Sequence, residues 1–257
     1  MDLGLSGKTA LLMSSTQGLG FGCALALVEE GVNVVINGRN IDRGLEAQSK
    51  LGDQAHFVQA DISQLSERKR LYEEAKAHLG TISILVTNVD GPPSGAFMSK
   101  SLDEWQTAFE MVMLSALDMA QQCLPDMIGQ GYGRIVNISS TSAKEITPGS
   151  VIANGIKPGL LGAFGTLARE IASTGVTVNS ILPGPFDTER IRRYARNEYQ
   201  DLLSEEAMRH YAEGRPMKRV GTISEFGALC AFLSSKKAGY ITGQSIVIDG
   251  GQVESLL

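Results

Sequence analysis

A glycine-rich turn near the start of the chain has the residue types and spacing of a phosphate-binding loop. It spans Ser14–Gly22 and includes Gly18 and Gly20. Glycines at the opening of a helix let the backbone approach a pyrophosphate, and the helix N-terminus supplies unpaired N–H groups and the positive end of its dipole. A glycine-rich turn alone can also serve close packing of a strand on a helix. Its position between an apolar strand and an apolar-faced helix favours a dinucleotide.

The elements that must position this turn follow from the hydrophobic periodicity of the chain. Short β-branched runs alternate with longer amphipathic stretches, and no repeat or linker interrupts them. This alternation predicts an α/β protein with a Rossmann-like, doubly wound parallel sheet, in a single domain over residues 1–257. The predicted strands are Thr9–Ser14, Asn33–Asn37, His56–Gln59, Ile84–Thr87, Arg134–Ile138, Thr177–Ile181 and Ser245–Ile248. The predicted helices are Gly20–Glu30, Ile41–Leu51, Ser63–His78, Leu102–Ile128, Ser150–Ala172 and Ile223–Ser234.

Length and composition favour an ordinary soluble globular protein. With 257 residues, of which 43% are hydrophobic and 20% charged, the chain can form one domain with a large core. The net charge of −5 is spread along the chain and no stripe of Lys and Arg with interleaved aromatics is present, so we expect no nucleic-acid partner. The apolar runs are shorter than a membrane span, so we also expect no membrane partner.

Cysteine usage and the N-terminal segment both favour a cytoplasmic protein. Cys23, Cys123 and Cys230 are far apart, and the three histidines are isolated from one another. We therefore expect buried free thiols and no metal site. Neither a basic segment nor a long apolar stretch precedes the first predicted strand, so we expect no targeting segment.

The end of the second predicted strand bears on the choice of cofactor. Gly38 and Arg39 follow Asn37 there, and no carboxylate is present to accept hydrogen bonds from a ribose 2′-hydroxyl. A guanidinium binds a 2′-phosphate through charge-assisted, often bidentate hydrogen bonds. The segment therefore favours NADP. NAD stays possible if Arg39 only caps a solvated turn or stacks on the adenine.

The segment Ser139–Lys157 resembles the catalytic stretch of the short-chain dehydrogenase/reductase family, in which a Ser is followed thirteen residues later by Tyr-x-x-x-Lys. Ser140 and Lys157 match this pattern, but Ala153 stands in the tyrosine position. In that family the Tyr exchanges the proton, the Lys lowers the pKa of the Tyr and holds the ribose, the Ser polarises the carbonyl, and an Asn completes a water relay. The Asn position falls at Val112 here. The resemblance thus implies that Ser140 and Lys157 are catalytic and that two of the four usual groups are absent.

Further motifs of this family occur in order across nearly the whole chain. Met13 and Ser14 replace the Thr and first Gly of the usual Thr-Gly-x-x-x-Gly-x-Gly, and Ser14 can be accommodated if its φ stays negative. Asp61 is similar to the Asp that binds the adenine amino group, and segment 183–188 is similar to Pro-Gly-x-x-x-Thr, which holds the nicotinamide amide. The resemblance implies cofactor contacts from Ser14, Thr16, Gln17, Gly18, Leu19, Gly20, Arg39, Asp61, Ile62, Asn88, Lys157, Pro183, Gly184 and Thr188.

The missing tyrosine leaves the proton donor open. Lys157 could serve, because the positive charge of an oxidised nicotinamide beside it should lower its pKa. A second source is the charged, aromatic-bearing stretch 187–219, which we expect to form a substrate lid that includes Tyr194, Tyr199 and Tyr211. Ordered water is the third. The lid also holds four arginines between residues 190 and 196, for which a basic helix surface is favoured over contacts with an anionic substrate.

One proline complicates the helix that carries the lysine. Pro158 would break a helix anywhere beyond its first turn. We therefore expect this helix to begin near Lys157 or to kink there, which would also reposition the Lys157 side chain.

Two functions are compatible with these features. The favoured one is an NAD(P)-dependent oxidoreductase that reduces a small-molecule carbonyl substrate to an alcohol with NADPH, using a non-standard proton donor. The alternative is a catalytically inactive dinucleotide-binding protein, acting as a redox sensor or a structural subunit. Retention of Ser140 and Lys157 favours the enzyme. The resemblance also suggests a homotetramer or a dimer.

Overall fold

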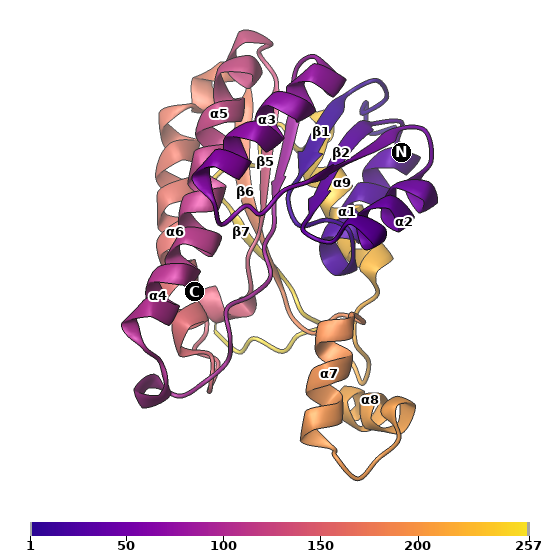
Figure 1. The fold of residues 1–257 in the computed structure, drawn as a ribbon, viewed down its shortest axis with the longest axis vertical. Coiled ribbons are helices and arrows are strands. Elements are labelled where there is room, and N and C mark those ends of the chain that lie inside the picture. Colours follow the sequence, from indigo (N-terminus) through magenta and orange to yellow (C-terminus); the bar gives the residue numbers. More distant parts are fainter. Residues whose placement is uncertain (1, 256–257) are drawn as a thin grey trace.

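Seven parallel strands form one sheet in the computed structural model, which describes residues 2–255 (Figure 1). Met1 and residues 256–257, at the ends of the predicted domain, lie outside this range. The strand order is β3-β2-β1-β4-β5-β6-β7, so the predicted Rossmann-like, single-domain fold is confirmed. The strands are β1 (Thr9–Leu12), β2 (Asn33–Gly38), β3 (Ala55–Gln59), β4 (Ile84–Thr87), β5 (Gly133–Ile138), β6 (Val176–Pro183) and β7 (Ser245–Ile248).

Helices cover both faces of the sheet, with α1, α2 and α9 on one face and α3, α5 and α6 on the other (Figure 1). Among residues 2–255, none of the helices is long and apolar enough to cross a membrane. The helices are α1 (Gly18–Glu29), α2 (Ile41–Leu51), α3 (Leu65–Leu79), α4 (Leu102–Phe109), α5 (Ser115–Gly129), α6 (Val151–Glu170), α7 (Glu189–Glu198), α8 (Ser204–Glu213) and α9 (Ile223–Ser234).

The central strands are buried along their whole length because helices pack on both sides of them. Every residue of β4, β5 and β6 is buried. In the middle of the sheet Leu11 of β1 pairs with Val35 of β2 and with Leu85 of β4. The three cysteines are free thiols in the hydrophobic cores on the two faces of the sheet, and their predicted burial is confirmed.

The predicted helix Leu102–Ile128 is interrupted by a π-helical turn at Glu110–Leu114, between α4 and α5. A π turn inserts one extra residue into a helix and changes the direction of the side chains around it. Val112 lies on this turn, packs with Ile152 and Ile156 of α6, and lines a small inner cavity beside Lys157. The π-helical turn thus places Val112 next to the small cavity that Lys157 also lines.

The helix that carries Lys157 begins at Val151, so the expected start near Lys157 is wrong. The first turn is held by the side chain of Asn154, whose amide bonds both the N–H and the carbonyl of Thr147. Ile152 is buried against the π turn and adds apolar packing. These contacts outweigh the one backbone hydrogen bond that Pro158 removes, and the exposed Pro158 ring lies on the outer side of α6.

The predicted lid, residues 187–219, consists mainly of α7 and α8, which project beyond the end of the sheet (Figure 1). The two helices pack on each other through a separate apolar cluster that includes Ala195, Met208 and Tyr211. A small core of this kind holds the pair together while leaving it attached to the sheet by the loops at its two ends.

Candidate cofactor and substrate cleft

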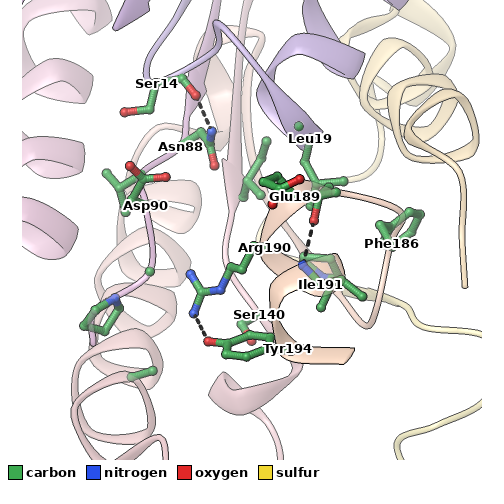
Figure 2. A pocket seen from close by; sticks show the side chains of 18 of the residues that line it. Ser14, Leu19, Asn88, Asp90, Ser140, Phe186, Glu189, Arg190, Ile191 and Tyr194 are labelled. Carbon is green, nitrogen blue, oxygen red and sulfur yellow. Dashed lines mark hydrogen bonds between the residues drawn. The ribbon is translucent and has the colours of Figure 1, made fainter. Parts of the chain in front are cut away.

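A cleft of about 1270 Å³ opens at the carboxyl ends of the strands, beneath the glycine turn and above α7 (Figure 2). It starts where the strand order reverses, between β1 and β4, which is where α/β sheets of this type bind ligands. Its volume exceeds the roughly 300–1,000 Å³ of an ordinary small-molecule pocket. The cleft therefore has room for a dinucleotide together with a small substrate.

The glycine turn is held in place by two asparagine side chains, the buried Asn37 and the half-buried Asn88. Asn37, at the end of β2, accepts a hydrogen bond from the Ser14 N–H and donates to the carbonyls of Val58 and Ala60. Asn88, after β4, donates to the Ser14 carbonyl at 2.8 Å (Figure 2). The turn is thus fixed from both neighbouring strands.

Ser14 adopts a φ of +44°, so the negative φ that the sequence analysis required is not observed. The conformation belongs to the left-handed region, which glycine adopts freely and which costs other residues about 1–2 kcal/mol. Both backbone hydrogen-bonding groups of Ser14 are held by asparagines, and these contacts keep the strained geometry. The backbone therefore follows the course that a glycine at this position would take.

The N-terminus of α1 faces the cleft and has no side-chain cap. Gln17 is its N-cap residue, and its side chain makes no capping hydrogen bond. The first N–H groups of the helix are thus available to an anion. Thr16, Gln17, Gly18 and Leu19 line the cleft. Gly20 does not: a Cβ there would lie 2.8 Å from atoms of Ser14, Ser15 and Asn88, so Gly20 serves the packing of the turn.

The cleft end next to β2 and β3 carries two arginines. Arg39 ends the turn after β2 and lies 3.8 Å from the exposed Asp90 carboxylate. Arg43, in the first turn of α2, lines the same end and was missed by the sequence analysis. A Cβ at Gly38 would lie 2.7 Å from Thr16, so this position has no room for a carboxylate side chain. Two guanidiniums without a competing acid at position 38 are suited to a phosphate.

Asp61 and Ile62 line the floor of the same end of the cleft. The Asp61 carboxylate accepts hydrogen bonds from both the N–H and the hydroxyl of Ser63, which fix its direction. Ile62 is buried and offers an apolar surface. This pair fits the edge and face of an adenine ring.

The opposite end is bounded by Pro183, the last residue of β6, and by Gly184 and Thr188 of the loop that follows. The Gly184 N–H donates to the carbonyl of Ile248, and a Cβ at Gly184 would lie 2.6 Å from Asp249. Thr188 caps α7, and its methyl group lies 3.6 Å from the place of a Cβ at Gly18. The loop and the glycine turn therefore meet across the cleft.

Taken by their chemistry, these groups fit an extended dinucleotide. Uncapped N–H groups lie at the centre for a pyrophosphate, an apolar and carboxylate-bearing floor lies at one end for adenine, and Thr188 lies at the other end for a nicotinamide amide. The residues present thus match the three parts of the cofactor in order.

Ser140 lines the cleft with its hydroxyl partly free. It caps the short turn Thr141–Ala143, where its Oγ accepts a hydrogen bond from the Ser142 N–H at 3.2 Å. A serine hydroxyl has one donor and two acceptor positions, so its O–H remains available. Ser140 can therefore donate to a carbonyl oxygen in the cleft.

Lys157 is 8% exposed and lies at the inner wall beside Ser140. Its Nζ donates to the Ser139 carbonyl at 2.9 Å. Burial, and secondarily the positive charge of Arg190, lower the pKa of Lys157 from its ordinary 10.5 to about 7. The ammonium is thus able to release a proton near neutral pH.

Ala153 lies one helical turn before Lys157 and lines the cleft. Residues four apart share one face of a helix. A methyl group at this position leaves the space on the cleft side of Lys157 open. Beneath the lysine, Val112 contributes an apolar side chain to the inner cavity, where the resemblance leads one to look for an asparagine.

Helix α7 contributes Arg190 and Tyr194 to the cleft, and their side chains extend toward the loop after β4 (Figure 2). The Tyr194 hydroxyl bonds the Arg190 Nη2 at 3.1 Å and the Ser94 hydroxyl at 3.2 Å. Of the other lid tyrosines, Tyr211 lines the cleft, while Tyr199 contacts the ring of His210 between α7 and α8.

The structure brings nearly all the predicted site residues to one cleft. Gly20 is the exception. The lining includes Ser14, Thr16, Gln17, Gly18, Leu19, Arg39, Asp61, Ile62, Asn88, Ser140, Lys157, Pro183, Gly184 and Thr188. The sequence contains arginines at positions 43 and 190, but it does not show that their side chains enter the cleft, because this depends on how α2 and α7 are oriented.

A family model described as enoyl-(acyl carrier protein) reductase matches residues 13–252 of this chain, from the glycine turn through β7. The chain belongs to the short-chain dehydrogenase/reductase family. The sequence resemblance is thereby confirmed across the whole fold. Among the four catalytic positions that the resemblance implies, two carry other residues in this chain, namely Ala153 and Val112.

Relatives of known activity are similar over their full length. The 3-oxoacyl-(acyl-carrier-protein) reductase of Staphylococcus epidermidis is 30% identical over 248 residues, which are 95% of this chain and 98% of that protein. The NADPH-dependent reductase BacG of Bacillus subtilis is 29% identical over 98% of this chain and 100% of its own. A solved structure, L-sorbose reductase from Gluconobacter frateurii complexed with NADPH and L-sorbose, has a TM-score of 0.94 at 28% identity, covering 100% of both chains.

These relatives share a reaction class. Each is named a reductase, and the similarity spans both the dinucleotide and the substrate ends of the cleft. The coarse class of this short-chain dehydrogenase/reductase is therefore an NAD(P)-dependent oxidoreductase that acts on a small molecule.

Proposed function

We propose that this protein reduces a carbonyl compound to an alcohol with NADPH and takes the proton from Lys157. The observation that carries the proposal is the position of Lys157: buried beside Ser140, with a pKa of about 7 and with the small Ala153 on its cleft side. An acid with a pKa near the working pH is the most effective proton donor.

The preference for NADPH rests on the two arginines at the adenosine end. Arg39 and Arg43 both line the place expected for the 2′-phosphate, and Thr16 leaves no room for a carboxylate at Gly38. Two relatives named above are described with NADPH, which supports the same choice. NADH would lose the charge-assisted bonds and find no acceptor for its 2′-hydroxyl.

Ser140 and Thr188 orient the reacting groups. When bound, the cofactor supplies the hydride to the carbonyl carbon. Thr188 and the Pro183–Gly184 backbone hold the amide end of the cofactor, and the Ser140 O–H donates to the substrate carbonyl oxygen. Holding both reactants in line is the largest contribution, on the order of 7–11 kcal/mol in favourable cases.

Lys157 completes the reaction by transferring a proton to the carbonyl oxygen, directly or through one water. The N–H bond of the ammonium breaks, the alcohol O–H forms, and the neutral amine takes a proton back from solvent. Loss of the proton is favoured by burial and by the nearby positive charge of Arg190. General acids contribute typically ~10²–10⁴-fold, so a less ideal donor slows the reaction without preventing it.

The lid and the assembly complete the proposal. α7 and α8, within residues 187–219, close over the substrate and exclude water. The chain works as a homotetramer or dimer in the cytoplasm. Light scattering on the purified protein measures the assembly, and a monomer would contradict it.

The test is NADPH consumption by the purified protein with a panel of aldehydes, ketones and oxoacids, alongside NADPH binding measured by fluorescence. We expect turnover that falls about 10²-fold in Ser140→Ala. Ser139→Ala is the matched control, because the Ser139 hydroxyl has no partner among residues 2–255 and its carbonyl is kept. Tight NADPH binding without turnover would contradict the proposal and favour the redox-sensor or structural role, for which the loss at Ala153 is the motivating observation.

A further inference from the structure

Arg190 of α7 differs from Arg192 and Arg196 of the same helix in having no acidic partner. Arg192 pairs with Asp187 at 2.7 Å and with Glu205 at 2.8 Å. Arg196 pairs with Glu189 at 2.6 Å. No ion pair reaches Arg190 in the described part of the chain, residues 2–255, and its hydrogen bond goes to the neutral Tyr194 hydroxyl. A basic helix surface, as expected from the sequence, describes its neighbours but not Arg190.

The Arg190 guanidinium lies inside the cleft, against the loop after β4. A Cβ at Gly91 would lie 2.1 Å from its Nη1, so the group packs directly on the Gly91 backbone. Figure 2 shows the side chain extending from α7 to this loop, with the ring of Tyr194 below it. The guanidinium is close enough to Lys157 for its charge to affect that amine. Two cations therefore face the substrate end.

Three of the acids that line the cleft are paired with arginines other than Arg190. Asp187 pairs with Arg192, Glu189 pairs with Arg196, and Asp90 lies 3.8 Å from Arg39. The groups around Arg190 are instead hydroxyls. Ser94 and Tyr194 share one hydrogen bond, so one of their two O–H groups stays free whichever of them donates.

The pKa of Tyr194 also indicates that Arg190 and Ser94 stabilise negative charge next to them. Burial by itself would raise the pKa of Tyr194. The hydrogen bond to Ser94 and the charge of Arg190 outweigh burial, and the pKa lies below its ordinary 10. A cluster that stabilises negative charge on its own phenol also stabilises the negative charge of a ligand.

We propose that Arg190, Tyr194 and Ser94 bind a carboxylate of the substrate, so that the carbonyl compound reduced by this protein is an oxoacid. A planar guanidinium and a neighbouring O–H match the two oxygens of a carboxylate, and such charge-assisted bonds are stronger than neutral ones. The inference rests on the proposed carbonyl reduction. It adds a second point of attachment, at the lid, to the one that Ser140 gives the carbonyl oxygen.

Matched pairs of oxoacids and their methyl esters test the inference, with the spacing between carbonyl and carboxylate varied. We expect the acid to be preferred in kcat/KM by about 10–100-fold, and Arg190→Met to remove at least about tenfold of that preference. Arg193→Met is the matched control, because Arg193 is an exposed arginine of the same helix that does not line the cleft. It should leave the preference within about twofold.

A second variant keeps the positive charge of Arg190 but moves its guanidinium. Gly91→Ala places a methyl group against Nη1 and displaces the guanidinium, since the Gly91 φ is not in the left-handed region. It should lower the acid preference with little effect on the ester. Circular dichroism confirms that each variant is folded.

A binding measurement separates this inference from the proposed function. Acetate and malonate are titrated into the protein with NADPH by calorimetry, and reduction is assayed in parallel. Carboxylate binding that needs Arg190 but comes without turnover would support the site and contradict the reductase. Reduction of acids and esters alike, unchanged in Arg190→Met, would support the reductase and overturn the site. Weakened NADPH binding in Arg190→Met with an unchanged acid preference would assign the guanidinium to a cofactor phosphate and also overturn it.

Discussion

Two regions of the cleft are built by different means. At the glycine turn, the groups suited to a pyrophosphate are backbone N–H groups of α1, and the turn itself is held by Asn37 and Asn88. At the substrate end, the corresponding groups are side chains from three separate elements: Ser140, Lys157 and Arg190. A backbone site persists when side chains change, as the strained but retained turn at Ser14 illustrates. A side-chain site can lose one group, such as the hydroxyl expected at position 153, without any change of fold.

This difference teaches where divergence is tolerated. Replacing a tyrosine by Ala153 alters one cleft-lining side chain on the first turn of α6, which Asn154 and Ile152 continue to hold. Replacing a glycine by Ser14 would have displaced the turn had the asparagines not fixed it. The side chain at position 153 can thus differ from the pattern that the resemblance implies without a change in the turn that Asn37 and Asn88 hold.

The largest expected effect comes from restoring the lost hydroxyl. Ala153→Tyr places a phenol four residues before Lys157, on the same helix face. We expect the rate of carbonyl reduction to rise by ~10²–10⁴-fold, the usual contribution of a general acid. Ala153→Phe is the control, because it adds the ring without the hydroxyl. An equal gain from both variants, or no gain from either, would show that the proton donor is not what limits the rate.

A smaller effect is expected on NADPH affinity when the arginines at the adenosine end of the cleft are replaced. Arg39→Ala and Arg43→Ala each remove one guanidinium from the proposed 2′-phosphate site. Loss of a charge-assisted hydrogen bond should weaken NADPH binding by about 10–100-fold in each variant. Binding of NADH, measured by the same fluorescence titration, should stay unchanged. Equal weakening of both cofactors would place these arginines elsewhere.

Position 38 gives a related prediction. Gly38→Asp alone should fail to create a preference for NADH, because its Cβ would lie 2.7 Å from Thr16. The double variant with Thr16→Gly removes that contact, and we expect it to raise the ratio of NADH to NADPH affinity by about tenfold relative to the single variant. A single variant that already prefers NADH would contradict the packing argument.

The smallest expected effect is on stability at the turn. Ser14→Gly relieves the positive φ of +44° and should stabilise the folded chain by about 1 kcal/mol, since the strain relieved exceeds the added chain entropy of glycine. For a chain of this length, that is a rise of roughly 2–4 °C in the midpoint of thermal unfolding. A lower midpoint would mean that the Ser14 side chain contributes more than its backbone strain costs.

The fold and the cofactor end could be predicted from the sequence because they depend on local patterns. Apolar strands at regular spacing give the parallel sheet, and β4, β7, α2 and α9 have the predicted bounds. The order of the motifs along the chain then places the glycine turn, Asp61 and Thr188 on one edge of the sheet.

The substrate end could not be predicted in the same way because it depends on tertiary contacts. Pro158 argues against a helix that Asn154 and buried Ile152 nevertheless stabilise. Nothing in the spacing of the α7 arginines distinguishes Arg190 from Arg192; only the course of the loop that carries Gly91 does so. Likewise, the left-handed turn at Ser14 follows from two asparagines distant in sequence.

The central claim is that Lys157 gives up the proton, and the pH dependence of kcat/KM for NADPH-dependent reduction tests it most directly. The pKa of Lys157 lies at about 7, so its protonated, proton-donating form is lost as the pH rises through that value. We predict that log kcat/KM falls with a slope of −1 above about pH 7 in the natural protein. In Lys157→Arg, kcat/KM should be lower and should not change with pH, because a guanidinium keeps its proton. A level profile in the natural protein, or an unchanged fall in Lys157→Arg, would contradict the account.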